Sequence, residues 1–263
     1  MNKIYSATLL TLLGLCPLLN AVTITFDDAS TDLTSNFDYS ANPTQYTWQA
    51  AGGVDNTGSV STSTLFNTTA AYTPGTLNFS TIGDSGSISI DFLWTDTLGT
   101  GNNYGVMQLG LVKTLGAVLD TRAILMRSGS EVNQVYFRYL TNSGFTNDSD
   151  LINLVDSTWY RMEVTFTMTA ADTIKAEMTL LNIGSDGTAT PVLISSYTAE
   201  RASDIIGEDV YTGFITQRAY AGSVTTIDNY STSAIPEPGE GAVFMGALAL
   251  IVFGGLRKIR ARR

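Results

Sequence analysis

The sequence predicts an all-β protein: a two-sheet antiparallel β-sandwich with an N-terminal signal peptide and one C-terminal transmembrane helix. Between the chain ends, short segments alternate apolar and polar residues, the period of a half-buried strand. Clusters of Gly, Asn, Asp and Ser separate these segments, as expected for tight turns. Long apolar stretches occur only near the two ends, with no helical stripe between them. Residues 22–230 are therefore assigned to one β-sandwich domain.

The strands are predicted from this alternation. The clearest strand is expected over Thr158–Met168, where every second residue from Tyr160 onward is apolar. Ser87–Trp94, Asn133–Leu140 and Thr173–Ile183 alternate in the same way. A hairpin is expected over 174–198, and further strands near 22–26, 45–49, 71–79, 104–113, 117–126, 211–217 and 223–230.

Residues 1–21 are expected to form a secretory signal peptide. Lys3 precedes the apolar stretch Ala7–Leu19, and Ala21 is a suitable last residue before cleavage. The single cysteine, Cys16, lies within this segment, and the chain has no histidine. The exported domain therefore lacks disulfides, cysteine and histidine nucleophile chemistry and the usual zinc ligands, so we expect it not to be an enzyme.

The C-terminal residues combine a linker with a short motif, an apolar stretch and a basic end. The linker 231–240 contains Pro236-Glu237-Pro238, and the uncharged residues 241–256 are predicted to form the transmembrane helix. Its apolar part spans ~22 Å as a helix, which is short for a hydrocarbon core of ~30 Å. By the positive-inside rule the tail 257–263 stays in the cytoplasm. Its basic residues are Arg257, Lys258, Arg260, Arg262 and Arg263.

In this order and position, the motif, the apolar span and the basic tail resemble the PEP-CTERM sorting domain, the bacterial C-terminal signal read by exosortases. The alternative is an ordinary single-pass anchor with an accidental Pro236-Glu237-Pro238. The resemblance implies an exported precursor held transiently in the inner membrane. It also implies processing at the motif by an exosortase-type enzyme and delivery to the cell envelope, surface or extracellular matrix.

The body of the chain carries a second resemblance. The strand that begins Thr158-Trp159-Tyr160-Arg161, the alternating hairpin after it and the closing segment Thr226–Tyr230 look like a concanavalin A-like or laminin G-type jelly roll. Carbohydrate-binding modules share that architecture, and the resemblance implies the fold without fixing an activity.

The predicted domain is strongly acidic. Residues 22–234 hold 22 acidic and eight basic residues, a net charge of −14. This charge argues against nucleic acid or anionic polysaccharide as an electrostatic partner and suits divalent cations. A structural calcium ion is predicted at Asp27, Asp28 and Asp228, because the first and last strands of such sandwiches often lie side by side. The alternative is that Asp27 and Asp28 begin a turn and Asp228 caps the last strand.

A surface for neutral glycans is also predicted. Sugar recognition uses exposed aromatic faces beside polar side chains, which Trp48, Tyr104 and Trp159 are placed to provide. Trp159 is the strongest candidate because it alternates with the apolar residues of its strand. The alternative is that all three tryptophans of the chain pack inside the sandwich.

The leading functional hypothesis is a non-enzymatic structural or adhesive role at the cell surface or in the matrix, where extracellular polysaccharide is a candidate partner. A lectin-like module for neutral glycans is the first alternative. A jelly-roll glycoside hydrolase is the second, and the chain lacks the Glu-x-Asp-x-x-Glu cluster commonly found in such enzymes.

Overall fold

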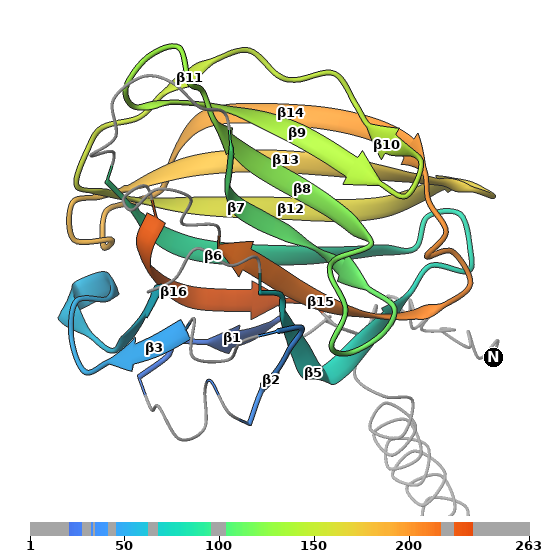
Figure 1. The fold of residues 1–263 in the computed structure, drawn as a ribbon, viewed down its shortest axis with the longest axis horizontal. Helices are drawn as coiled ribbons and strands as arrows, with labels where there is room; N and C mark the ends of the chain where they lie inside the picture. Colours follow the sequence, from blue (N-terminus) through green and yellow to red (C-terminus); the bar gives the residue numbers. More distant parts are fainter. Residues whose placement is uncertain are drawn as a thin grey trace, which may run out of the picture. The chain divides into compact units, whose positions relative to one another are not determined.

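Two antiparallel sheets, each of eight strands, make up the domain in the computed structural model (Figure 1). The structure describes residues 21–27, 33, 35–41, 46–62, 68–95, 104–216 and 224–233. The predicted signal peptide, Pro236-Glu237-Pro238 motif, transmembrane helix and basic tail lie outside these residues. Among the described residues, no helix is long and apolar enough to span a membrane.

Sheet A contains the longest strands. Its main path runs β14-β13-β12-β6-β16-β4-β3, and β1 pairs with β16. In that order the strands are β14 (Val192–Ala202), β13 (Thr173–Gly184), β12 (Thr158–Ala170), β6 (Ser85–Trp94), β16 (Val224–Thr232), β4 (Ser59–Thr62), β3 (Tyr46–Gln49) and β1 (Val22–Ile24).

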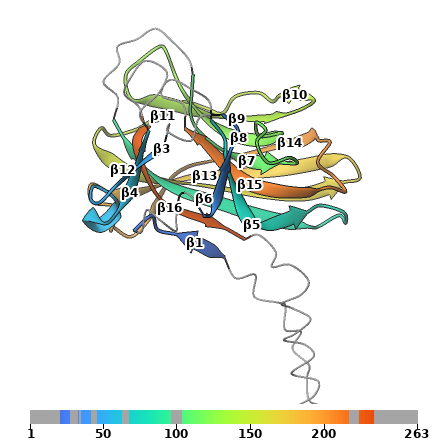
Figure 2. The ribbon, with the colours of Figure 1, turned by 60° about the horizontal axis from the view of Figure 1, so that its bottom comes forward.

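Sheet B faces sheet A. Figures 1 and 2 show its strands β7, β8 and β9 lying over β12, β13 and β14 of sheet A. Its main path runs β10-β9-β8-β7-β15-β5-β2, and β11 pairs with β9. In that order the strands are β10 (Gly144–Phe145), β9 (Gln134–Thr141), β8 (Thr121–Arg127), β7 (Tyr104–Val112), β15 (Asp209–Thr216), β5 (Ala70–Asn78), β2 (Phe37–Tyr39) and β11 (Ile152–Asn153).

The predicted fold class and the strongest predicted strands are confirmed. The segment predicted over Thr158–Met168 is β12, and the hairpin predicted over 174–198 is β13 with β14. Alternation sets the register, because the apolar residues of β12 must all face sheet B. Met162 accordingly lies opposite Ile90 of β6 and Leu180 of β13, and all three side chains are fully buried.

Aromatic side chains from β2, β15 and β16 fill part of the space between the two sheets. The Phe37 ring lies 5.5 Å from the Phe214 ring and 5.3 Å from the Tyr230 ring, both in edge-to-face geometry. The Tyr230 hydroxyl donates a hydrogen bond to Thr212 Oγ1 at 2.8 Å, so its burial leaves no unsatisfied polar group. Burial raises the pKa of Tyr230, which stays neutral in the folded protein.

The first and last described strands lie side by side, as the sequence predicted. Val22 of β1 lies opposite Thr232 of β16, and Ile24 lies opposite Tyr230. On its other side β16 pairs with β6, where one extra residue interrupts the register after Asp228. Asn229 occupies this bulge with a φ of 47°, a left-handed conformation that asparagine tolerates better than most residues.

Candidate functional site

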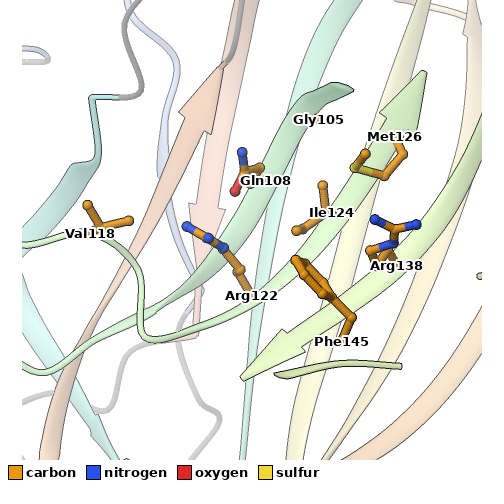
Figure 3. A pocket seen from close by; sticks show the side chains of 8 residues that line it. All are labelled: Gly105, Gln108, Val118, Arg122, Ile124, Met126, Arg138 and Phe145. Carbon is orange, nitrogen blue, oxygen red and sulfur yellow. The ribbon is translucent and has the colours of Figure 1, made fainter. Parts of the chain in front are cut away.

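A pocket of about 290 Å³ opens on the outer face of sheet B, the face that points away from sheet A. Its lining comes from the three adjacent strands β7, β8 and β9, from β10 and from the loop after β7 (Figure 3). The lining residues are Gly105, Gln108, Val118, Arg122, Ile124, Met126, Arg138 and Phe145. The volume lies near the lower end of small-ligand pockets, which hold ~300–1,000 Å³.

The strand registers bring polar and apolar side chains together in this pocket. Gln108 of β7, Ile124 of β8 and Arg138 of β9 are cross-strand partners and therefore share one row on the outer face. Arg122 stands in the next row, between Leu140 of β9 and Gly110 of β7. Arg122 and Gln108 are thus diagonal neighbours, a spacing of ~7–8 Å that long side chains can bridge.

Glycines leave the row beside Arg122 without side chains. Gly110 of β7 is the cross-strand partner of Arg122, and Gly213 of β15 is the cross-strand partner of Gly110 on its other side. A Cβ atom at Gly110 would lie 2.3 Å from the Thr121 carbonyl oxygen, so no other residue fits this backbone without a shift.

Arg138 and Phe145 form a fixed wall of the pocket. Arg138 donates two hydrogen bonds to Asp148, at 2.6 and 2.7 Å, and its guanidinium lies 5.1 Å from the Phe145 ring centre. Arg201 donates a hydrogen bond to the Phe145 carbonyl oxygen at 2.6 Å, which ties β10 to sheet A. The Phe145 side chain nonetheless stays 54% exposed, so its ring is available to a ligand.

Arg122 and Gln108 contribute polar atoms that have no protein partner in the described part of the chain. The Nε atom of Arg122 and the Oε1 atom of Gln108 are both buried and make no hydrogen bond there. Burial also lowers the pKa of Arg122, although a guanidinium remains charged at neutral pH. These two atoms have almost no exposed surface, but both side chains line the pocket, so their remaining N–H groups are the ones that a ligand there can reach.

The outer side of sheet A carries a different polar cluster, built around two buried carboxylates. Asp91 of β6 and Asp228 of β16 are cross-strand partners with 0% exposure. Arg161 of β12 donates hydrogen bonds to both oxygens of Asp91, at 2.6 and 2.9 Å, and Asn229 donates a third at 3.0 Å. Asp91 is therefore paired and saturated, which is the condition under which a buried charge is tolerated.

Asp228 has hydrogen bonds but no cationic partner. Its two oxygens accept backbone N–H groups from Val54, at 2.8 Å, and from Asn229, at 2.7 Å. Burial raises the pKa of Asp228 to about 7; the two N–H groups oppose this shift, and the nearby carboxylates of Asp91 and Asp27 add to it. The side chain is thus a buried carboxyl that titrates near neutrality.

The predicted calcium ligands are brought together only in part. Asp27 follows β1 and lies close enough to affect Asp228, but its carboxylate accepts a hydrogen bond from Thr25 at 2.8 Å. Asp28 lies outside the described residues. No group of three or more acidic, histidine or cysteine side chains in the described part of the chain could hold a metal ion. The calcium site stays a prediction.

The aromatic residues predicted to bind glycans do not form an exposed platform. Trp159 is 3% exposed and Tyr104 is 8% exposed, so the expectation that they face solvent was wrong. Trp159 lies opposite Gly184, the last residue of β13. The loop that follows β13 contacts the short 3₁₀ helix Val54–Asn56, because the Asp55 N–H donates a hydrogen bond to the Asp186 carbonyl oxygen at 2.9 Å. Alternation identifies the face of a sheet but not whether loops cover that face.

The two other tryptophans are also tied to the fold. Trp48 is half-buried, packs against the core, and donates its indole N–H to the Phe26 carbonyl oxygen at 2.7 Å. Trp94 is fully buried and donates its indole N–H to Asn133 Oδ1 at 2.9 Å. Trp94 and Trp48 therefore pack in or against the core, as the alternative interpretation expected, whereas Trp159 is buried outside the core cluster.

The pocket residues were not predicted as a site. The apolar run Ala123–Met126 of β8 is buried throughout, so the sequence does not show that Ile124 and Met126 face away from sheet A. Their meeting with Gln108 and Phe145 depends on the pairing of β7, β8, β9 and β10, for which the sequence carries no short motif.

No protein-family model and no curated protein matches the sequence. Among solved structures, the chain is similar to the metal-free lectin I-B4 of Griffonia simplicifolia, with 10% identity and a TM-score of 0.48 over 80% of this chain and 98% of the lectin. The Emp47p carbohydrate recognition domain has 11% identity and a TM-score of 0.47, over 81% of this chain and 95% of that domain. A protein of unknown function from Shewanella oneidensis has 19% identity and a TM-score of 0.45, over 81% of this chain and 86% of that protein.

Proposed function

We propose that the protein is an exported, non-enzymatic surface or matrix protein that binds a carbohydrate in the pocket on the outer face of sheet B. The observation that carries this proposal is the composition of the pocket. It combines an exposed aromatic ring at Phe145, an apolar floor at Ile124 and Met126, and hydrogen-bonding groups at Gln108 and Arg122. Sugars are recognised by this combination, because their C–H faces stack on rings while their hydroxyls need directional partners.

Binding suits the pocket better than hydrolysis does. Glycoside hydrolysis normally uses two carboxyl groups on either side of the scissile bond. The eight lining residues include no aspartate or glutamate. The carboxylate of Asp148, next to the lining residue Arg138, accepts two hydrogen bonds from Arg138.

A glycan array tests the binding proposal. The full chain is expected to retain a defined subset of glycans. Phe145→Ala is expected to weaken that retention about fivefold or more, since the stacking of a nucleic-acid base on one aromatic side chain contributes ~1–3 kcal/mol. Ile82→Ala removes an apolar side chain of similar exposure, in the turn between β5 and β6, and serves as the control. Equal retention by both variants would place the glycan elsewhere, and no retention by the unmodified chain contradicts the proposal.

The sorting part of the proposal rests on the sequence of the C-terminal residues. We infer export through the signal peptide, transient anchoring in the inner membrane and processing at Pro236-Glu237-Pro238 by an exosortase-type enzyme. Glu237→Ala is expected to leave unprocessed precursor in the membrane fraction of the native host. Glu240→Ala changes the same charge three residues later and is expected to be processed normally. Normal release of the Glu237 variant would refute recognition of the motif.

A further inference from the structure

Arg122 differs from the other basic residues that the structure describes. Arg138, Arg161, Lys113 and Lys175 each form an ion pair with a carboxylate, at 2.5 to 3.1 Å. Arg127 and Arg201 donate hydrogen bonds to backbone carbonyl oxygens. Arg122 forms no ion pair and no hydrogen bond with any described residue, although its Nε atom is buried. A half-buried guanidinium without an anion is unfavourable, because its hydration is reduced and nothing replaces it.

The chemistry of the missing partner follows from the geometry of a guanidinium. Its N–H groups form a planar fork that matches the two oxygens of a carboxylate. The Gln108 side chain also lines the pocket, and its amide group can form a hydrogen bond with a hydroxyl group of a small polar ligand. A ligand that satisfies both residues therefore carries a carboxylate and a hydroxyl on one compact frame.

We infer that the pocket recognises the carboxylate of a hydroxylated acid, of which a uronic acid sugar is the representative, with Arg122 binding the carboxylate and the Gln108 amide forming a hydrogen bond with a hydroxyl group. This inference rests on the proposed carbohydrate-binding function and specifies the class of sugar. The Phe145 ring at the rim then stacks against the sugar ring. The bound species is a single acidic residue, such as a chain end or side branch.

The net charge of the domain explains why the expected ligand is a single acidic sugar and not an acidic polymer. Residues 22–234 carry a net charge of −14, which repels a long polyanion at low salt. A pocket of about 290 Å³ holds one sugar residue. The single carboxylate of that sugar lies beside Arg122, so the attraction to this guanidinium outweighs the repulsion from the more distant acidic side chains. Local pairing thus favours a single acidic sugar even though the whole domain disfavours an acidic polymer.

The test compares three sugars that differ at one group. Binding of D-glucuronate, D-glucuronamide and D-glucose to the full chain is measured by saturation-transfer NMR titration at low and high salt. Glucuronate is expected to bind about 10- to 100-fold more tightly than the two neutral sugars, the range for a hydrogen bond to a charged group. The preference is expected to shrink at high salt.

Variants assign the preference to one side chain. Arg122→Gln is expected to abolish the preference for glucuronate over glucuronamide and glucose. Lys175→Gln, which removes a positive charge from sheet A, is expected to leave the preference intact. Persistence of the preference in Arg122→Gln overturns the assignment to Arg122.

Failures of the two proposals have different signatures. Equal binding of all three sugars, weakened by Phe145→Ala, overturns the carboxylate inference and leaves carbohydrate binding standing. Absence of binding by any of the three at 10 mM, together with an empty glycan array, overturns both. The comparison of glucuronate with glucuronamide needs no variant, so it holds even if Arg122→Gln folds poorly.

Discussion

Asp228→Asn should change how the stability of the protein depends on pH. In the folded protein the Asp228 carboxyl is fully buried and has a pKa of about 7, against an ordinary value of 3.8. The unfolded chain releases this proton near pH 4, whereas the folded chain keeps it until near pH 7. Between these values the folded state binds more protons, so its stability falls as pH rises.

The magnitude follows from the distance between the two pKa values. Each pH unit in that window costs ~1.4 kcal/mol, so the full loss between pH 4 and pH 8 is ~4 kcal/mol. Below pH 4 both states are protonated and above pH 7 both are ionised, so the loss is confined to this window. Asparagine at position 228 keeps the size of the side chain and removes the titration.

Urea unfolding, followed by tryptophan fluorescence at pH 4 to 8, measures the effect. The free energy of unfolding of the Asp228→Asn variant, minus that of the unmodified protein, should become ~4 kcal/mol more favourable to the variant between pH 4 and pH 8. Asp150→Asn removes an exposed carboxyl and controls for net charge. A difference that stays constant across this range refutes the reasoning, because Asp228 would then be ionised in the folded protein throughout.

Three further substitutions test the packing around the same strands, each by urea unfolding at pH 7. Arg161→Met should lower the free energy of unfolding by ~3–5 kcal/mol, because it leaves the buried Asp91 carboxylate unpaired; a loss below 1 kcal/mol would show that the pair contributes little. Gly53→Ala should cost ~1–3 kcal/mol, since its methyl group would lie 2.6 Å from Asp228 Oδ2, and an unchanged stability contradicts this contact. Tyr230→Phe should cost ~1 kcal/mol by removing one buried hydrogen bond, and a stabilised variant would count against it.

The fold was predictable where burial imposes a simple period. Thr158–Met168 alternates because one side of β12 faces the core, and nothing competes with that pattern along most of its length. The short strands Phe37–Tyr39 and Ser59–Thr62 were not predicted. These two strands pair with β5 and β16, and such pairing between distant segments decides their position without leaving a local pattern.

The candidate site was less predictable for a related reason. The expectation for Trp159 failed because loop packing, not the direction of the side chain, decides whether the outer face of a sheet is open. Arg122 and Gln108 are 14 positions apart and become neighbours only through the register of β7 and β8. Register follows from the whole sheet, so no local pattern marks these two residues as a pair.

The position of β16 inside sheet A has a consequence for how the chain matures. Thr23 and Ser231 are hydrogen-bonded although they are 208 positions apart, and β16 separates β6 from β4. Sheet A cannot be completed until the last described strand has been synthesised and delivered, so folding of this domain is late and dominated by non-local contacts. For a protein exported as we propose, this delay keeps the chain unfolded, and therefore able to pass through a translocation pore, until export is complete.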